Sequence, residues 1–195
     1  MTPTVALVTE LIERYGALQN PREVMALVRY LGEVNPPYGM SQQPTLFVEV
    51  GVWRGGNAAI LKTFFPKARY IGVDILDVNS PEVSDAPALR TAVERFGLEL
   101  VQGDTGSPDT VERVRQMIGE QRADYMFIDA SHDYDSVKRD YQLWSPLAVR
   151  VGFHDVHNPM VYRFWQEVCA FDTDHARTAA LWKEMDGHGI GVVWA

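Results

Sequence analysis

Cysteine is nearly absent from the sequence: Cys169 is the one cysteine among 195 residues. A disulfide within the chain needs two cysteines, and cysteine zinc sites and iron–sulfur clusters need more, so the composition excludes all three. Apolar residues recur at helical spacing around Cys169, which indicates a buried structural thiol and not a nucleophile. We expect a reducing, cytoplasmic setting for this chain.

Positive charge is also scarce, because 18 lysines and arginines stand against 26 acidic residues and leave a net charge of −8. Such a charge disfavours broad electrostatic binding to phosphate backbones or anionic membranes. No apolar run approaches the roughly 18 residues that a membrane-spanning helix requires, and the opening Met1-Thr-Pro-Thr lacks the basic and apolar regions of a secretory signal. We therefore expect no nucleic acid and no membrane among its partners.

Short apolar runs alternate with amphipathic segments along most of the chain, and a hydrophobic content of 46% suffices for the core of one domain. We predict strands near 46–50, 69–74, 98–102, 124–129 and 149–153, and helices near 56–65, 87–97, 108–121, 133–145 and 159–170. The tail predicts a hairpin of 178–183 and 190–194 around Asp186-Gly187. The predicted fold class is α/β: a Rossmann-like, doubly wound, seven-stranded sheet, mostly parallel with this antiparallel hairpin, and helices on both faces.

Two amphipathic helical patterns precede the first strand. Asn20 is placed to cap the second helix, Pro21 takes its first position, and Glu23 is positioned to close a capping box. We treat 1–40 as a helical lead-in, which serves as a lid over a ligand pocket or as the surface of a homodimer. Residues 41–195 form the main domain.

The first strand ends in a glycine turn, Phe47-Val-Glu-Val-Gly-Val-Trp-Arg-Gly-Gly56. Gly51 permits backbone angles that a Cβ would forbid, Gly55 lets a ligand and the next helix approach closely, and that helix offers unpaired N–H groups. The pattern lacks the third glycine of the dinucleotide fingerprint, and Glu49 would repel a pyrophosphate. The turn therefore indicates a nucleotide-type cofactor other than NAD.

All five predicted parallel strands carry an acid at or just past the carboxyl end, where open α/β sheets bind ligands: Glu49, Asp74, Asp104, Asp129 and Asp155. Asp74 follows Gly51 by 23 residues, near the spacing of about 20 for a ribose-binding carboxylate. Asp104 and Thr105 suit an adenine, by accepting from its amine and bonding the purine edge. The alternative for Asp104 is a cap of the following helix.

The turn pattern Glu49-x-Gly51-x-x-x-Gly55 resembles the first motif of class I S-adenosylmethionine-dependent methyltransferases, in which the turn wraps the methionine part of the cofactor. The acid suits a sulfonium ligand. We expect S-adenosylmethionine to be held by Glu49, Gly51, Val52, Trp53, Gly55, Asp74, Asp104, Thr105 and Asp129. Trp53 stands in the turn itself, where it can wall the cofactor or the substrate.

Two later segments, Phe127-Ile-Asp-Ala-Ser-His-Asp-Tyr134 and Gly152-Phe-His-Asp-Val-His-Asn158, are similar to the small metal-dependent O-methyltransferases, which include catechol, caffeoyl-CoA, sugar and antibiotic enzymes. The resemblance implies a divalent ion, Mg or Mn, held by Asp129, His154 and Asp155, and a general base at His132. His154 departs from the family's usual acid or amide and favours softer ions. Substrate binding, or a satisfied structural histidine, are the alternatives for His154.

The predicted function is methyl transfer from S-adenosylmethionine to a small-molecule hydroxyl, assisted by a metal. Two other classes stay open: an NAD(P)-dependent oxidoreductase or epimerase on a Rossmann fold, and a non-catalytic cofactor-binding module. The sequence does not choose among sugar, phenol and peptide-derived acceptors, and N-methylation stays open beside O-methylation.

Overall fold

The computed structural model describes residues 2–33, 43–76, 87–171, 178–180 and 188–195. Its helices are α1 (Val5–Tyr15), α2 (Pro21–Glu33), α3 (Gly56–Phe64), α5 (Pro87–Phe96), α6 (Pro108–Ile118), α7 (Tyr134–Trp144) and α8 (Pro159–Phe171), with a 3-10 turn at Ser145–Leu147. Its strands are β1 (Leu46–Val50), β2 (Arg69–Asp74), β3 (Leu98–Gln102), β4 (Tyr125–Ile128), β5 (Arg150–Phe153), β6 (Thr178–Ala180) and β7 (Gly191–Trp194).

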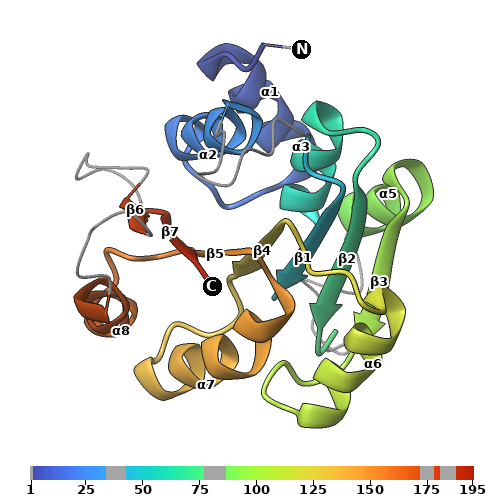
Figure 1. Cartoon of the computed structure of the whole chain (residues 1–195). Coiled ribbons are helices and arrows are strands. Elements are labelled where there is room, and N and C mark those ends of the chain that lie inside the picture. Colours follow the sequence, from blue (N-terminus) through green and yellow to red (C-terminus); the bar gives the residue numbers. More distant parts are fainter. Residues whose placement is uncertain (1, 34–42, 77–86, 172–177, 181–187) are drawn as a thin grey trace.

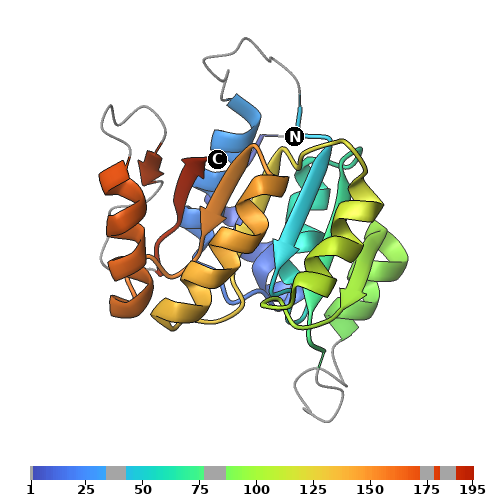
Figure 2. The same cartoon turned by 60° about the horizontal axis from the view of Figure 1, so that its bottom comes forward.

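These strands form one sheet in the order β3-β2-β1-β4-β5-β7-β6. The first five strands run parallel, whereas β7 pairs antiparallel with both β5 and β6. In Figure 2 the arrowheads of the parallel strands point to the lower edge and the red β7 points the other way. The predicted doubly wound α/β fold with an antiparallel carboxyl-terminal hairpin is confirmed; the turn at Asp186-Gly187 lies outside the described residues.

The element bounds agree closely with the predicted ranges. The strand predicted for 178–183 is observed at Thr178–Ala180, and its remaining residues lie outside the described ones. Elsewhere the largest difference is at α6, which was expected to reach residue 121 and ends at Ile118. Gly119 follows with a φ of 65°, and its N–H bonds to the carbonyl of Arg115. A residue without a Cβ adopts this left-handed backbone at little cost, so the glycine ends the helix.

The sheet separates two cores because successive side chains of a strand point to opposite faces. On β1, Leu46, Val48 and Val50 pack with apolar side chains of α6, α7 and α8. Phe47 faces the other core, which α1, α2, α3 and α5 supply. Figure 1 shows α1, α2 and α3 above the sheet and α6, α7 and α8 below it.

The amino-terminal helices are capped partly as predicted. The side chain of Asn20 accepts a hydrogen bond from the N–H of Arg22 at 2.9 Å. The capping box predicted for Glu23 is wrong: its carboxylate is fully buried and accepts from the N–H of Gly189 at 2.9 Å. The local pattern fits a capping box, but packing of α2 against the carboxyl-terminal segment gives this acid a distant partner.

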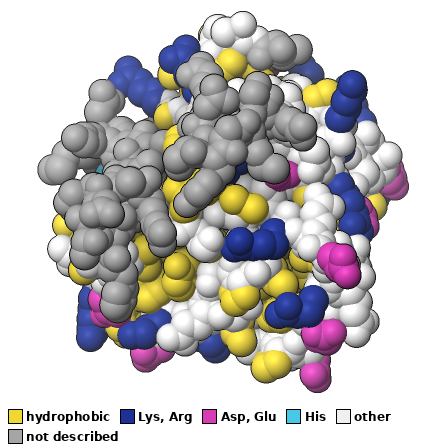
Figure 3. Space-filling view, in the orientation of Figure 1, with side chains coloured by type: hydrophobic (Ala, Val, Ile, Leu, Met, Phe, Trp, Pro, Cys, Tyr) yellow, Lys and Arg dark blue, Asp and Glu magenta, His cyan; other side chains and the backbone are white. Residues whose placement is uncertain are grey.

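The surface is mixed in character on the face that Figure 3 draws, where basic side chains are interspersed with acidic, apolar and uncharged ones. Among the described residues, no helix is both long enough and apolar enough to cross a membrane.

Candidate active site

The glycine turn after β1 lies directly against the end of β4. Gly51 has a φ of 93°, and a Cβ at this position would come within 2.4 Å of the carbonyl oxygen of Asp129. Its N–H bonds to the carbonyl of Val73 at 2.8 Å, which closes the turn onto β2. Trp53 also has a positive φ, 47°. Glycine at position 51 is therefore required by space as well as by backbone conformation.

Asp74, at the end of β2, fastens this turn. Its Oδ2 accepts from the N–H groups of Val52 at 2.9 Å and Trp53 at 2.8 Å, and its Oδ1 accepts from the N–H of Leu76 at 2.9 Å. A carboxylate has about four lone-pair positions, so about one stays available to a ligand. The predicted ribose contact therefore shares this carboxylate with the backbone of the glycine turn.

Glu49 lies on β1 beneath the turn and is only 1% exposed. Asn57 and the hydroxyl of Tyr70 each donate to its carboxylate at 3.0 Å. Burial is the main cause that raises the pKa of Glu49 to about 8, and the charges of Asp129 and Asp74 raise it further. A positive charge in the adjoining cavity would favour the ionised form.

One cavity of about 1070 Å³ opens at this edge of the sheet. It brings together most of the predicted site residues: Glu49, Gly51, Val52, Trp53, Asp74, Asp104, Thr105, Asp129, His132, His154 and Asp155. Gly55 is not among the lining residues. It packs against α5, where an added Cβ would lie 2.9 Å from the Cβ of Ala92. Gly55 also has a φ of 73°, so both its backbone conformation and helix packing favour glycine here.

Asp104 and Thr105 line the cavity from the loop after β3. Oδ1 of Asp104 accepts from the N–H of Gly106 at 2.8 Å, and the hydroxyl of Thr105 donates to Oδ2 of the buried Asp140 at 3.0 Å. Ser107 takes the N-cap position of α6 without a side-chain hydrogen bond. Asp104 thus stabilises its own loop through Oδ1. Among the described residues, Oδ2 of Asp104 accepts no hydrogen bond.

Asp129, His154 and Asp155 form a cluster whose candidate ligand atoms all lie within 4.8 Å of one another. Nδ1 of His154 is 3.0 Å from Oδ1 of Asp129 and 3.1 Å from Oδ2 of Asp155. Ligand atoms about 2.1 Å from a shared octahedral ion lie about 3 Å apart, so these spacings fit a divalent cation. Two carboxylates and an imidazole suit Mn²⁺, Fe²⁺ or Zn²⁺ better than Mg²⁺.

Asp155 has a φ of 56°, unusual for a residue with a Cβ. Strained backbone of this kind concentrates at functional sites. Here it accompanies the projection of two consecutive side chains, His154 and Asp155, toward the same cluster.

His132 stands at the cavity with its side chain 50% exposed. Its Nε2 lies 2.8 Å from Oδ2 of Asp155 and 3.6 Å from Oδ1 of Asp129. Hydrogen bonds to Asp129 and Asp155 raise the pKa of His132 to about 10. For His154, burial opposes the shift, but bonds to the same two carboxylates outweigh it and raise the pKa to about 10.

Two further side chains belong to this cluster and were not predicted. Nε2 of Gln19 donates to Oδ2 of Asp129 at 3.2 Å. Nδ1 of His188 lies 2.7 Å from Oδ1 of Asp155, and the His188 ring centre is 5.4 Å from that of His154. The sequence carries no local signal for Gln19. For His188 the only available signal is the rarity of histidine, with five in the chain.

Residues 48–158 match a family model described as a methyltransferase domain. Mycinamicin VI 2''-O-methyltransferase from Micromonospora griseorubida is 25% identical over 130 residues, which cover 63% of this chain and 29% of that protein. The chain therefore spans under a third of the length of this curated relative.

Several solved structures share the fold. The MycE methyltransferase from the mycinamycin biosynthetic pathway, in complex with Mg and SAH, matches with a TM-score of 0.62 at 16% identity, over 96% of this chain and 54% of that one. A putative caffeoyl-CoA O-methyltransferase from Staphylococcus aureus gives 0.60 at 10% identity, over 98% and 92%. An O-methyltransferase from Bacillus cereus in complex with SAH gives 0.59 at 15% identity, over 100% and 93%.

Proposed function

Because the chain belongs to the methyltransferase-domain family, we propose that it transfers a methyl group from S-adenosylmethionine to a hydroxyl of a small molecule, with a divalent metal ion assisting. One observation carries the proposal. The glycine turn, the acids of five strand ends and the Asp129–His154–Asp155 cluster all border a single cavity. The SAH in two related structures and the Mg in one of them support a cofactor of this kind and a divalent ion here.

The cavity suits a cofactor and an acceptor together, because its volume of about 1070 Å³ is slightly above the roughly 300–1,000 Å³ usual for small-molecule sites. S-adenosylmethionine would be held by Glu49, the turn around Gly51, Asp74 and Asp104, and when bound it supplies an electrophilic methyl group. Gly51 keeps the turn free of a side chain, and the buried Glu49 offers its carboxylate to a cationic ligand.

The acceptor side of the site contains the residues for proton removal. A divalent ion held by Asp129, His154 and Asp155 would lower the pKa of an alcohol or phenol. Nε2 of His132 is within hydrogen-bond distance of Asp155, so its ring is held at the cavity with half of its surface exposed. A cation bound to Asp129 and Asp155 would oppose the carboxylate charges that raise the pKa of His132, so His132, neutral in that state, is the general base that takes the hydroxyl proton.

The two rival classes are less well supported. A nicotinamide-dependent oxidoreductase would place its pyrophosphate beside Glu49, and the family match does not favour it. A non-catalytic module has no need of a base beside a cluster of metal-binding side chains. The lead-in helices α1 and α2 are proposed as part of the catalytic unit, since the loop between them lines the cavity.

The decisive experiment is a binding and turnover assay on the purified chain. S-adenosylmethionine and NAD are titrated separately by calorimetry, and production of S-adenosylhomocysteine is then followed with sugar, phenol and amine acceptors with and without Mn²⁺ or Mg²⁺. We expect S-adenosylmethionine to bind and a hydroxyl acceptor to turn over only with metal. Binding of NAD alone would overturn the proposal.

A further inference from the structure

Each carboxylate of the candidate metal cluster has one oxygen turned inward and one turned outward. Oδ1 of Asp129 faces Nδ1 of His154 at 3.0 Å, whereas its Oδ2 accepts from Nε2 of Gln19 at 3.2 Å. Oδ2 of Asp155 faces the same His154 nitrogen at 3.1 Å, whereas its Oδ1 is 2.7 Å from Nδ1 of His188. Both acids are thus held from outside by a nitrogen donor.

The orientation of Gln19 follows from chemistry. Its amide carries an oxygen and a nitrogen at nearly the same distance from the chain, and only the nitrogen can donate to a carboxylate. Reversing the amide would put its oxygen against Oδ2 of Asp129, two acceptors facing each other. His188 is likewise the only hydrogen-bond donor in its pair with Asp155.

The two outer residues come from segments outside the matched family region, 48–158. Gln19 lies in the connection between α1 and α2, and His188 precedes β7. Glu23 of α2 joins these segments, because its buried carboxylate accepts from the N–H of Gly189, next to His188. A single hydrogen bond therefore links the two supports across the rim of the cavity.

We propose that Gln19 and His188 are positioning residues, which fix the two acids so that one oxygen of each is presented to a divalent ion. The inference rests on the proposed metal-assisted function. A carboxylate rotates about its Cβ–Cγ bond unless its outer oxygen is held, and outer partners of this kind typically contribute about 10- to 100-fold to metal affinity. The lead-in helix pair and the carboxyl-terminal segment thereby become part of the metal site.

The test measures metal affinity without turnover. Mn²⁺ is titrated by calorimetry into the full chain without S-adenosylmethionine or acceptor, for wild type, Gln19→Met and His188→Ala. We expect about 10- to 100-fold weaker binding in each variant. His188→Asn should recover most of the affinity, because its amide can donate to the same oxygen of Asp155. A purely structural role for His188 would not predict this rescue.

Gln116→Met provides the matched control, because Gln116 also donates to a carboxylate, that of Glu112 at 3.2 Å, but on the exposed face of α6. Its Mn²⁺ affinity should equal that of wild type. The side chain of His188 is 61% exposed, so His188→Ala should fold even if a change at Gln19 does not.

Three results would overturn the inference. Wild-type Mn²⁺ affinity in folded His188→Ala and Gln19→Met would leave the metal function standing and remove these two residues from it. Loss of a nitrogen ligand from the Co²⁺ absorption spectrum in His188→Ala would make His188 a ligand instead. Absence of Mn²⁺ binding by wild type would overturn the metal assistance and this inference together.

Discussion

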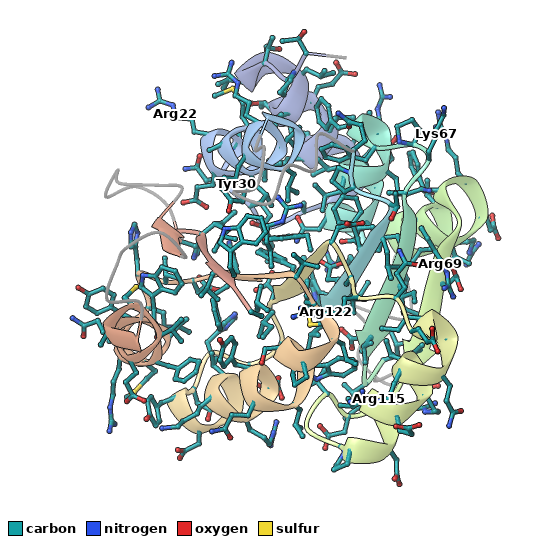
Figure 4. The ribbon with its side chains drawn as sticks, viewed as in Figure 1. Arg22, Tyr30, Lys67, Arg69, Arg115 and Arg122 are labelled. Atoms are coloured by element: carbon teal, nitrogen blue, oxygen red, sulfur yellow. The ribbon has the colours of Figure 1, made fainter. Side chains whose placement is uncertain are left out.

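The two edges of the sheet use charge in opposite ways. At the amino edge, Arg69 (Figure 4) begins β2. Its guanidinium pairs with Glu99 of β3 through two bonds of 2.6 and 2.8 Å. Asp124, just before β4, accepts three hydrogen bonds at one oxygen, from Thr45 and Leu46. At the carboxyl edge, by contrast, Oδ1 of Asp129 and Oδ2 of Asp155 both lie close to the same nitrogen, Nδ1 of His154.

This difference separates stability from function. An acid that is matched by a guanidinium or by backbone N–H groups lowers the free energy of the folded chain and has little capacity left for a ligand. At the carboxyl edge the partners of the acids are His132 and His154, imidazoles that can release a proton to make way for a metal ion, as a guanidinium cannot. Substitutions at the two edges should therefore give different phenotypes.

The largest effect is expected at the carboxyl edge, from Asp155→Asn. Asparagine tolerates the left-handed backbone that Asp155 adopts, φ 56°, so the fold should be kept while one anionic oxygen ligand is lost. Methyl transfer should fall by about 10³-fold, since a metal contributes several kcal/mol to the transition state. Turnover and S-adenosylmethionine affinity are measured together; unchanged turnover would remove Asp155 from the metal site.

At the amino edge, Asp124→Ala should destabilise the fold without impairing turnover. It leaves the N–H and hydroxyl of Thr45 and the N–H of Leu46 without their acceptor. At roughly 1 kcal/mol for each hydrogen bond, the free energy of unfolding should drop by about 2–3 kcal/mol. Urea unfolding gives this value, and Asp124→Asn, which keeps one acceptor oxygen, should recover part of it. Loss of kcat in folded Asp124→Ala would break the contrast between the edges.

Asp74 combines both uses of charge, and Asp74→Ala should weaken S-adenosylmethionine binding by about 10- to 100-fold. The reason is the loss of a charged acceptor that holds the N–H groups of Val52 and Trp53 in the glycine turn, with hydrogen bonds to charged groups contributing about 1.5–3 kcal/mol. Calorimetry measures the affinity. The affinity of Asp74→Asn should lie between those of wild type and Asp74→Ala, because its amide oxygen can still accept hydrogen bonds from the turn. Equal affinity in all three proteins would exclude a role for Asp74 in the cofactor site.

The sequence allows the strands and their acidic ends to be predicted because both are local features. Buried apolar runs give the strands, and parallel strands bring their carboxyl ends to one edge, so acids 25 residues or more apart in sequence meet there. The cap and proline at Ser107 and Pro108 likewise mark the start of α6. No knowledge of packing is needed for these features.

Packing decides what the sequence did not reveal. Gln19 reaches Asp129 across 110 residues only because α1 and α2 lie on the sheet face beside β1. Glu23 has the local pattern of a capping residue, yet its partner is Gly189, 166 residues away. Sequence spacing does not predict contacts between residues so far apart in the chain when the two segments lie outside the repeated strand–helix units.

The smallest effect concerns Glu49, the most deeply buried of the five strand-end acids. Its pKa is raised from 4.5 to about 8. Between these two pH values, Glu49 of the folded chain keeps a proton that the unfolded chain has lost. Stability from this group is full below pH 4.5 and declines as the pH rises toward 8. We expect Glu49→Gln, which can retain partners at Asn57 and Tyr70, to remove this decline, worth at most about 1.4 kcal/mol per pH unit.

Urea unfolding of wild type and Glu49→Gln between pH 5 and 9 tests this expectation, with all other titrating groups common to both proteins. The free energy of unfolding of Glu49→Gln should rise relative to that of wild type up to about pH 8, and the difference between the two proteins should then stay constant. Parallel curves would show that Glu49 is ionised throughout. That result would require a positive charge beside Glu49 in the folded chain. The negative charge of the acids at the carboxyl edge would then be balanced even without bound ligands.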